Sequence, residues 1–568
     1  MNKDATSDLP GAVIRITDYG AIPDSGQDAG PAVARAMEAV RWLGRPAVLE
    51  FPRGQYDFFQ DQAVKAPYYI SNTASEEEQP DVTKSIGLFL HGLKQVTVEG
   101  NGSLFLFHGK MTMFVLDACE NITIRNVDVD YASPTIAEMT VESIGDKYIE
   151  TRVHPDSRYT LDGDGFHWTG EGWRFRDGPA QQFHPRDNRT WRIPNPISAA
   201  VRVEERSPGR LRLHYAAVPD VSIGDVLQMR DGIRDQAGAF IHRCRNIVWS
   251  RVGMHYMHGL GMVGQYSENL TFREMDLSPR RSTGRTAAAF ADFLHLSGNR
   301  GRIEIADCRF EGAHDDAINV HGTHLRIMEQ TGPKQIRVRF MHAQSYGFDA
   351  FFPGDDIDFV RAATLTVYAS GRVERVTRIN PREMLLTLES TINQPVMPTD
   401  VVENATWTPE VRICRNTFAR IPTRGILVTT RRPVVIEQNR FERMEISGIL
   451  VADDASSWYE SGMVNDLTIR DNHFIECGTG GHPVIRIEPE VQEEGDGQAV
   501  HRHIRIEGNT FDTLGKVLEA QYVDQLTFAG NTIRRCDRVP ASSEKEDAES
   551  FITLQNCTNT RIKDNWLR

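Results

Sequence analysis

Three aspartates in two short segments are the residues of this sequence best suited to acid–base chemistry. Asp292 stands in the segment ADFLHLSG, and Asp315 and Asp316 open the segment DDAINVHG. Hydrolysis of a glycosidic bond needs one carboxylic acid that protonates the leaving oxygen and one carboxylate that activates water or attacks carbon. An Asp-Asp pair before a strand is by itself more often a turn. The prediction therefore depends on whether the fold brings Asp292 beside the pair.

A short pattern that recurs through the chain indicates how the fold could do this. Strand-like triplets are followed by Asn or a small apolar residue and then by another apolar residue. The clearest copies are VRICRNTF, VVIEQNRF, LTIRDNHF and IRIEGNTF. Several copies are 22 or 23 residues apart, and others 33 to 37. A unit of this length, with short β runs and no helical periodicity, is typical of one coil of a parallel β-helix.

Asn recurs at one phase of this pattern. Stacked coils would place these side chains above one another, so that each amide bonds its neighbour in a ladder. Asn also tolerates the left-handed backbone that a sharp bend between sheets requires. We assign these residues a structural role and no chemistry. They are Asn101, Asn416, Asn439, Asn472, Asn509, Asn531 and Asn565.

Two gaps in the repeat are each far too long for one coil. Both alternate apolar and polar residues and carry turn signals, which predicts a small antiparallel β-barrel or sandwich in each. Near the N-terminus, AGPAVARAMEAVRWL is predicted as an amphipathic helix that covers the open end of the stack. The expected fold is all-β, a right-handed parallel β-helix with two inserted β-barrels and an N-terminal capping helix. The expected segments are the cap and first coils (1–130), the first barrel (131–240), the coils with the aspartates (241–324), the second barrel (325–408) and the last coils (409–568).

The repeat also predicts which residues become neighbours. Aligning the apolar strand after each turn places Asp292 over Asp316, with Asp315 one residue earlier, and Arg424 in the same column on the next coil. Stacked coils are about 4.8 Å apart, and crowded carboxylates are typical of functional sites. Strict alternation would point Asp292 and Asp316 inward with the apolar residues two positions later. Both must therefore sit at a bend where the alternation breaks.

Other polar and aromatic residues near this column are candidates for substrate binding. Polar side chains on the outward parity of the same strands could bind sugar hydroxyls, although a satisfied polar group explains each of them equally well. They are Gln265, His295, Asn319 and His321. Trp458 and Glu460 lie in a loop after a predicted strand, where an aromatic ring could stack on a sugar or pack against the inserts.

The sequence gives little support for a metal, a cofactor or a nucleic-acid partner. His255 with His258, and His321 with His324, have spacings that some metal sites use, but no third and fourth ligand is evident. We therefore expect no metal and no cofactor. The net charge of -14 leaves no broad basic surface for nucleic acid. No apolar run has the length of a membrane span, and none near the N-terminus has that of a signal peptide.

Several longer segments carry a resemblance to a known family. They are YYISN, GSLFLFHGKM, HGLGMVGQYSENLTF, ADFLHLSG, GAHDDAINVHGTHL, IPTRGILVTTRRPVVI and ADDASSWYESG. Together they span almost the whole chain and resemble glycoside hydrolase family 110, whose members are exo-acting α-1,3-galactosidases, some of which cleave the blood-group B determinant.

The resemblance implies an inverting mechanism on a β-helix with β-barrel insertions. By resemblance, Asp315 is the general acid, and Asp292 and Asp316 hold and deprotonate water. Arg424 would keep the neighbouring carboxylate ionised if it adjoins Asp316. The expected partner is a glycan with terminal α-1,3-linked galactose, and this substrate class implies a secreted or periplasmic protein.

Two rival functions and two properties stay open at this stage. A polysaccharide lyase or polygalacturonase on the same fold would use basic residues near the carboxylates, and Arg424, Arg431 and Arg432 are available. A non-catalytic carbohydrate-binding β-helix would bind glycan without turnover, but it gains nothing from crowded aspartates. The sequence leaves open whether a branching fucose is required and whether the chain forms a homodimer.

Overall fold

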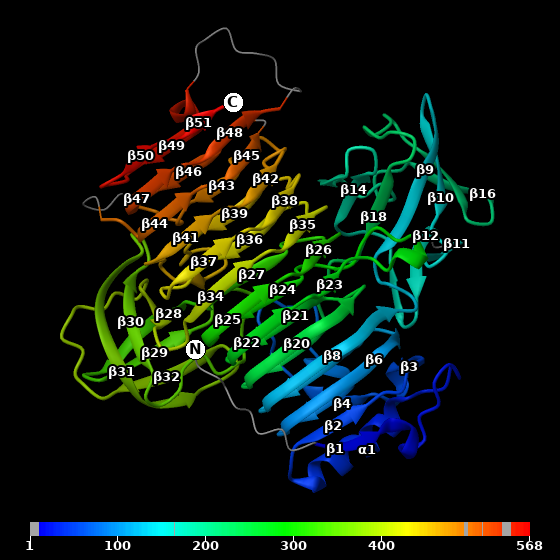
Figure 1. The fold of residues 1–568 in the computed structure, drawn as a ribbon, viewed down its shortest axis with the longest axis horizontal. Coiled ribbons are helices and arrows are strands. Elements are labelled where there is room, and N and C mark those ends of the chain that lie inside the picture. Colours follow the sequence, from blue (N-terminus) through cyan, green and yellow to red (C-terminus); the bar gives the residue numbers. More distant parts are fainter. Residues whose placement is uncertain (1–10, 164, 494–497, 514, 537–546) are drawn as a thin grey trace.

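The computed structural model describes residues 11–163, 165–493, 498–513, 515–536 and 547–568, and its main body is a stack of parallel β coils (Figure 1). The predicted right-handed parallel β-helix is confirmed. One long sheet runs the length of the stack and contains two strands from most coils. Its strands are β1 (Ala12–Arg15), β2 (Ala47–Glu50), β3 (Gln55–Phe59), β6 (Lys94–His108), β8 (Glu120–Tyr131), β20 (Arg245–Met254), β22 (Glu268–Arg273), β23 (Asp276–Leu277), β25 (Arg300–Ala306), β26 (Arg309–Glu311), β34 (Pro409–Cys414), β35 (Thr417–Ala419), β37 (Val434–Glu437), β38 (Arg440–Glu442), β41 (Leu467–Arg470), β42 (His473–Ile475), β44 (His501–Glu507), β45 (Thr510–Thr513), β47 (Val523–Ala529), β48 (Thr532–Arg535), β50 (Arg561–Lys563) and β51 (Trp566–Leu567).

A second sheet, which we call the site sheet, forms the other wall of the stack. Its strands are β4 (Val64–Pro67), β5 (Thr83–His91), β7 (Thr112–Asp117), β19 (Ala237–His242), β21 (Leu260–Gln265), β24 (Leu294–Ser297), β27 (Ile318–Thr323), β36 (Arg424–Val428), β39 (Ser447–Val451), β43 (Ile485–Ile487), β46 (Leu518–Gln521) and β49 (Ile552–Gln555). The register pairs Leu294 with Ile318 and Ile318 with Ile426. It is the register predicted for the aspartate column, and it makes β24, β27 and β36 neighbours although 100 residues separate the last two.

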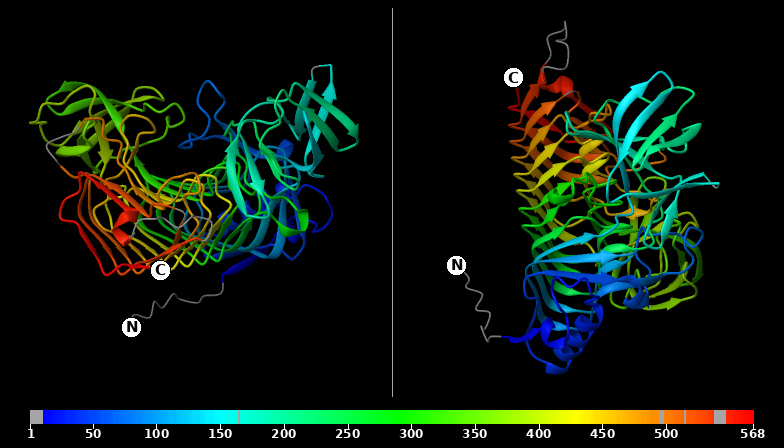
Figure 2. Two further views of the ribbon diagram at one scale, coloured as in Figure 1. Left: turned by 90° about the horizontal axis from the view of Figure 1, so that it is seen from above. Right: turned by 90° about the vertical axis from the view of Figure 1, so that its right-hand side faces the viewer.

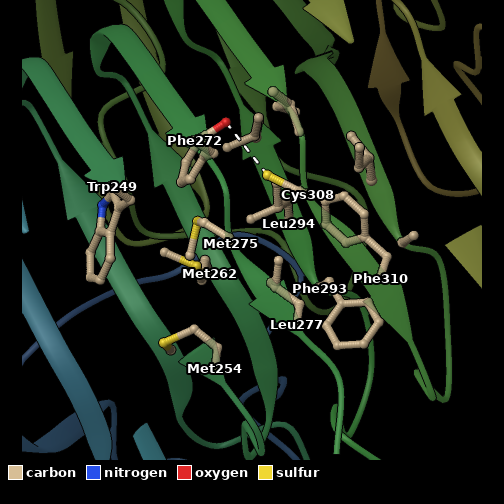
Figure 3. Close-up of a cluster of buried hydrophobic side chains, with 14 of the residues drawn as sticks. Trp249, Met254, Met262, Phe272, Met275, Leu277, Phe293, Leu294, Cys308 and Phe310 are labelled. Atoms are coloured by element: carbon tan, nitrogen blue, oxygen red, sulfur yellow. Dashed lines mark hydrogen bonds between the residues drawn. The ribbon is translucent and has the colours of Figure 1, made fainter. Parts of the chain in front are cut away.

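The interior between the two sheets is filled by apolar side chains in regular columns. Phe310, Phe418, Phe441, Phe474 and Phe511 stack face to face, with ring centroids 4.6 to 5.0 Å apart. Figure 3 shows the start of this column, with large side chains from neighbouring coils pointing into the same space. Burial of these rings explains why a repeat too small to fold alone becomes stable once coils stack.

The asparagine ladder is present in the C-terminal coils. From Asn416 to Asn565, each side-chain N–H donates to the Oδ1 of the next Asn at 3.0 or 3.1 Å. Two expectations are corrected. Asn101 lies outside this ladder and donates to the Phe51 carbonyl. The left-handed residue at each bend is the one before the ladder Asn, as at Gln438 and Asp471, because the Asn side chain is used for the ladder itself.

The predicted cap is the helix α1 (Gly30–Leu43), which begins with Pro31 in its first turn and ends at Gly44, a residue with φ of 57°. Its apolar face packs on β1, β2, β3 and β5 at the N-terminal end of the stack (Figure 1). Within the part of the chain that the structure describes, no helix is long and apolar enough to cross a bilayer.

Two inserted domains interrupt the stack and stand on the same side of it, at opposite edges (Figure 2). The first joins a seven-stranded antiparallel sheet and a three-stranded sheet around one core. Its strands are β9 (Ala137–Gly145), β10 (Tyr148–Val153), β11 (Arg158–Asp162), β12 (Gly165–Gly170), β13 (Trp173–Phe175), β14 (Ala180–His184), β15 (Arg189–Ile193), β16 (Arg202–Ser207), β17 (Arg210–His214) and β18 (Val226–Met229). The second is a closed barrel of β28 (Leu325–Gly332), β29 (Gln335–Arg339), β30 (Asp356–Arg361), β31 (Thr366–Arg378), β32 (Glu383–Leu388) and β33 (Val401–Asn404).

Candidate active site

A pocket of about 300 Å³ opens on the outer face of the site sheet, where its central coils meet Arg192 of the first insert. Seven of the ten predicted site residues line it. They are Asp292, Asp315, Asp316, Asn319, Arg424, Trp458 and Glu460. The structure therefore brings together the three aspartates that the repeat placed in one column.

A local break in the strand pattern turns the aspartates toward this pocket. Asp292 and Asp316 each stand just before a site-sheet strand, next to a bend. The two residues after Asp292, Phe293 and Leu294, are both buried in the interior (Figure 3). Because two consecutive side chains point inward, Asp292 is left on the outer side. The same holds on the next coil, and the predicted break in alternation is confirmed.

Asp316 is held by a two-pronged ion pair with Arg424. The Arg424 Nε donates to one carboxylate oxygen at 2.8 Å and Nη2 to the other at 2.6 Å. The backbone N–H of Arg424 adds a third bond at 3.2 Å. Burial lowers the pKa of Arg424, but the carboxylate of Asp316 outweighs it, and the net pKa is raised. The guanidinium therefore stays charged and fixes both oxygens of Asp316.

Asp292 is in a different environment, although it is one coil away. Its side chain is almost fully buried, and one oxygen lies 2.9 Å from the Nδ1 of His295. Burial raises the pKa of Asp292 well above its usual value, and the charges of Asp315 and Asp316 raise it further. The pocket thus holds one carboxyl group that favours its protonated form beside one that a cation neutralises.

Asp315 is the most exposed of the three aspartates, with 24% of its side chain accessible. Its Oδ1 accepts a hydrogen bond at 3.2 Å from Arg192, which belongs to β15 of the first insert. This contact places an inserted domain in direct touch with the aspartate column.

The three remaining predicted residues lie behind the pocket wall. Gln265 is fully buried and bonds the backbone of Tyr69 and Ser71, which anchors that segment to β21. His295 and His321 are also buried, and their Nε2 atoms face each other at 2.9 Å. These three side chains were expected to point outward and contact sugar directly. They do not line the pocket, because loops and the segment with Glu460 cover the strands that carry them.

Glu460 reaches the site through β40 (Glu460–Ser461), which pairs antiparallel with the end of β27. Its carboxylate accepts hydrogen bonds from the side chains of Asn72 at 2.8 Å and Asn319 at 3.3 Å. Burial raises the pKa of Glu460, but His321, His295 and these amides outweigh it, and the net pKa is lowered. Trp458, two residues earlier, is 45% exposed and packs on His342 of the second insert, with ring centroids 4.5 Å apart.

Asp454 shapes the loop that carries Trp458 and Glu460. Its carboxylate accepts backbone N–H groups from Ser456, Ser457, Trp458 and Tyr459. Burial raises its pKa, and the N–H bonds from Ser456 and Ser457 lower it more, so the net pKa falls below its usual value. The structure places Asp454 in the pocket lining.

Sequence reasoning missed three further lining residues, Asn72, Arg192 and Arg234. Asn72 ends the YYISN segment, and its membership in a family-like motif was the one available signal. Arg192 and Arg234 had no such signal, because they come from the first insert and from the chain that returns from it to the stack.

Histidine and carboxylate atoms that could hold a metal ion meet at one place in the described residues. One ligand atom each from His295, His321 and Glu460 lie within 4.8 Å of one another. The pairs noted for their spacing do not form such a group. The rings of His255 and His258 bond separate partners, Ser278 and Asp128 for the first and Thr135 and Asp235 for the second.

Comparison with known proteins assigns the chain to a family. Its inserts match two family models, GLAA-B beta-barrel domain I over residues 137–227 and domain II over 335–402. The chain is 43% identical over 548 residues to Alpha-1,3-galactosidase A of Bacteroides thetaiotaomicron, covering 96% of this chain and 95% of that protein.

Two further relatives and a solved structure also match this chain over most of its length. Alpha-1,3-galactosidase A of Akkermansia muciniphila is 39% identical over 89% of this chain and 84% of its own length. Alpha-1,3-galactosidase B of Bacteroides thetaiotaomicron is 33% identical over 97% and 90%. Among solved structures, a mannuronan C-5 epimerase A-module from Azotobacter vinelandii gives a TM-score of 0.41 at 12% identity over 97% of this chain and 99% of its own. With identity above 30% over almost its full length, the chain belongs to the α-1,3-galactosidase family, glycoside hydrolase family 110.

Proposed function

We propose that this protein is an exo-acting α-1,3-galactosidase that releases terminal galactose by an inverting acid–base mechanism. The observation that carries the proposal is the pocket in which Asp292, Asp315 and Asp316 converge, in a chain 43% identical to an α-1,3-galactosidase A. Hydrolysis with inversion needs a general acid and a base on opposite faces of the sugar. Three carboxyl groups in unequal environments supply both functions.

In this mechanism Asp316 is the base that deprotonates water. Its bidentate pairing with Arg424 fixes the position of both carboxylate oxygens, which a base needs in order to take a proton from a held water. Asp292, one coil away, shares the same water. A protonated Asp292 can donate to that water or accept from it and so fixes its position, while Asp316 takes the proton.

Asp315 is the general acid that protonates the leaving oxygen. Its partly exposed side chain lines the pocket next to Arg192. The remainder of the glycan would leave from this more open side. Trp458, exposed at the rim, offers a flat apolar surface on which the galactose ring can stack.

The test is turnover of linear and fucosylated α-1,3-galactosyl oligosaccharides, with NMR of the anomer formed first. We expect free galactose, with the β-anomer appearing before mutarotation. Asp315→Asn, Asp292→Asn and Asp316→Asn should each lower kcat by about 10²–10⁴-fold with unchanged circular dichroism. Near-wild-type turnover in all three variants would refute the site assignment.

The same assay separates the rival functions. A lyase would form an unsaturated, ultraviolet-absorbing product without consuming water, and a pure binding protein would retain glycan and release no monosaccharide. The ratio of kcat/KM for fucosylated and linear substrates decides whether the blood-group B determinant is a substrate. For a glycan of this class we also propose a secreted or periplasmic location.

A further inference from the structure

Two buried histidines behind the pocket are arranged in a way that the proposed hydrolysis does not use. His295 lies on β24 and His321 on β27, one coil further, and both side chains are at most 2% exposed. Together with Glu460 they form a compact group of three donor atoms. We propose that His295, His321 and Glu460 bind a divalent transition-metal ion, with Zn²⁺ as the best-suited ion.

The argument begins with the hydrogen positions on the two rings. The Nδ1 of His321 lies 2.6 Å from the carbonyl oxygen of Gly322. A carbonyl only accepts, so this Nδ1 carries a hydrogen. The Nδ1 of His295 lies 2.9 Å from an oxygen of Asp292, so it can donate its hydrogen to this side chain when a metal ion occupies Nε2. In this state both neutral rings keep their lone pairs on Nε2.

These two lone pairs face each other. The Nε2 atoms of His295 and His321 are 2.9 Å apart, and Oε1 of Glu460 is 3.5 Å from Nε2 of His321. A metal ion between these three atoms, or a proton shared by the two rings, would stabilise electron-pair donors this close together. Metal–ligand bonds of about 2.0–2.2 Å at angles of about 90–115° place ligand atoms about 2.9–3.5 Å apart. The spacings between His295 and His321 and between His321 and Glu460 fall in this range.

The surroundings also have the form expected around metal ligands. Histidines that bind a metal usually donate their second N–H to a carboxylate or a backbone carbonyl, and here the Nδ1 of His295 faces Asp292 and the Nδ1 of His321 faces the Gly322 carbonyl. Metal-binding carboxylates are themselves hydrogen-bonded, as Glu460 is by Asn72 and Asn319. The Oδ1 of Asn319 is buried without a hydrogen-bond partner and is a candidate for a further ligand.

The donor set selects the kind of ion. Two imidazole nitrogens and one carboxylate are a ligand set found for Zn²⁺, and imidazole also suits Co²⁺, Ni²⁺ and Cu²⁺. Ca²⁺ and Mg²⁺ prefer oxygen ligands throughout and are not expected to compete. The proposal replaces the sequence-based expectation of no metal. The sequence did not reveal this group of ligands because Glu460 joins the two histidines only through the pairing of β40 with β27.

The test measures metal binding directly and needs no glycosidase turnover, so it can fail independently of the proposed function. The full chain, without a polyhistidine tag, is stripped with a chelator and titrated with Zn²⁺ alone by calorimetry. Elemental analysis after gel filtration gives the stoichiometry. We expect one Zn²⁺ per chain with micromolar or tighter affinity, and a visible Co²⁺ spectrum of a site with nitrogen and oxygen ligands. An excess of Ca²⁺ or Mg²⁺ should not displace either ion.

Variants locate the ion. Glu460→Gln keeps the size and hydrogen-bonding capacity of the side chain and should weaken Zn²⁺ binding at least tenfold, as should His321→Gln. His501→Gln is the matched control, because His501 is a fully buried histidine outside the group and its replacement should leave Zn²⁺ affinity unchanged. If His321→Gln does not fold, Glu460→Gln decides.

Two results would overturn the proposal. The first is wild-type protein that retains less than about one-fifth of an equivalent of Zn²⁺, which would mean that a proton shared between the two rings relieves their contact. The second is Zn²⁺ binding that survives unchanged in the folded Glu460→Gln variant, which would place the ion elsewhere.

Discussion

At the scale of single residues, the two parallel hydrogen bonds from Arg424 to Asp316 allow a test. It asks whether the site needs the geometry of these bonds or only the positive charge of the side chain. Arg424→Lys keeps a positive charge but cannot form two parallel bonds to one carboxylate. We expect kcat to fall by about 10–100-fold with little change in KM, because the substrate still fits while the base is misplaced. Steady-state kinetics on an α-1,3-galactosyl substrate measures the split. A Lys variant with wild-type kcat would show that the paired bonds are not needed.

His501 gives a residue-scale prediction for stability. It is fully buried on β44, where its Nδ1 accepts the Val464 N–H at 3.1 Å, and burial lowers its pKa to about 3. Below pH 6.5 the unfolded chain binds a proton at His501, whereas the folded chain does not. The contribution of the neutral, buried His501 to the free energy of unfolding is therefore fully present above pH 6.5 and is lost as the pH falls toward 3. At pH 5 the loss is about 2 kcal/mol.

The measurement is denaturant unfolding of wild-type protein and His501→Gln at pH 7.5 and pH 5. The variant should lose less stability than wild type between these pH values, by roughly the same 2 kcal/mol. Parallel pH curves for the two proteins would show that another group controls the acid response.

At the scale of the elements, each asparagine of the ladder should stabilise the stack more strongly the more deeply its side chain is buried. Asn472 accepts the backbone N–H of Asn439 and donates to the Ile436 carbonyl, and all of these groups are buried. Asn472→Ala leaves them without partners, which we expect to cost about 2–4 kcal/mol. Asn565→Ala, at the partly exposed last rung, is the control and should cost less. Equal losses of unfolding free energy would argue against a ladder that depends on burial.

The loop from Asp454 to Glu460 is the other element on which the site depends. Four backbone N–H groups converge on the Asp454 carboxylate, so its conformation is fixed before substrate arrives. This preorganisation puts Trp458 at the rim and Glu460 in the wall, two positions that a free loop would not hold.

At the scale of the whole molecule, the two inserts contribute to the site in different ways, because the first supplies Arg192 to the pocket lining and the second packs His342 against Trp458. The first insert docks through buried Glu138, which accepts the backbone N–H groups of Thr286 and Ala287, and through Arg192 at Asp315. The second docks through Arg431, paired with Asp358 and Glu403 of the barrel. The pocket lining therefore combines residues of the stack, of the first insert and of the loop before β40.

Arg192 allows a test of this arrangement. Arg192→Ala should lower kcat/KM by up to about fivefold, the value of a partly exposed ion pair, without lowering the unfolding temperature. Arg189→Ala is the matched control, because Arg189 lies on the same strand but pairs with Glu445 outside the pocket lining. If both variants behave alike in kinetics, the first insert does not contribute through Arg192.

The sequence by itself determined the β-helix, the capping helix and the column of Asp292, Asp316 and Arg424. These follow from a local repeat, and coils that share one period must stack in one register whatever loops out between them. Only the tertiary structure decided the positions of Arg192, Arg234 and Glu460. Arg192 belongs to the first insert, Arg234 to the segment that returns from this insert to the stack, and Glu460 to the short strand β40. The position of each depends on side-chain complementarity between surfaces that are distant in sequence. The period of a strand gives no information about such surfaces, which is why the neighbours of His295 and His321 could not be foreseen.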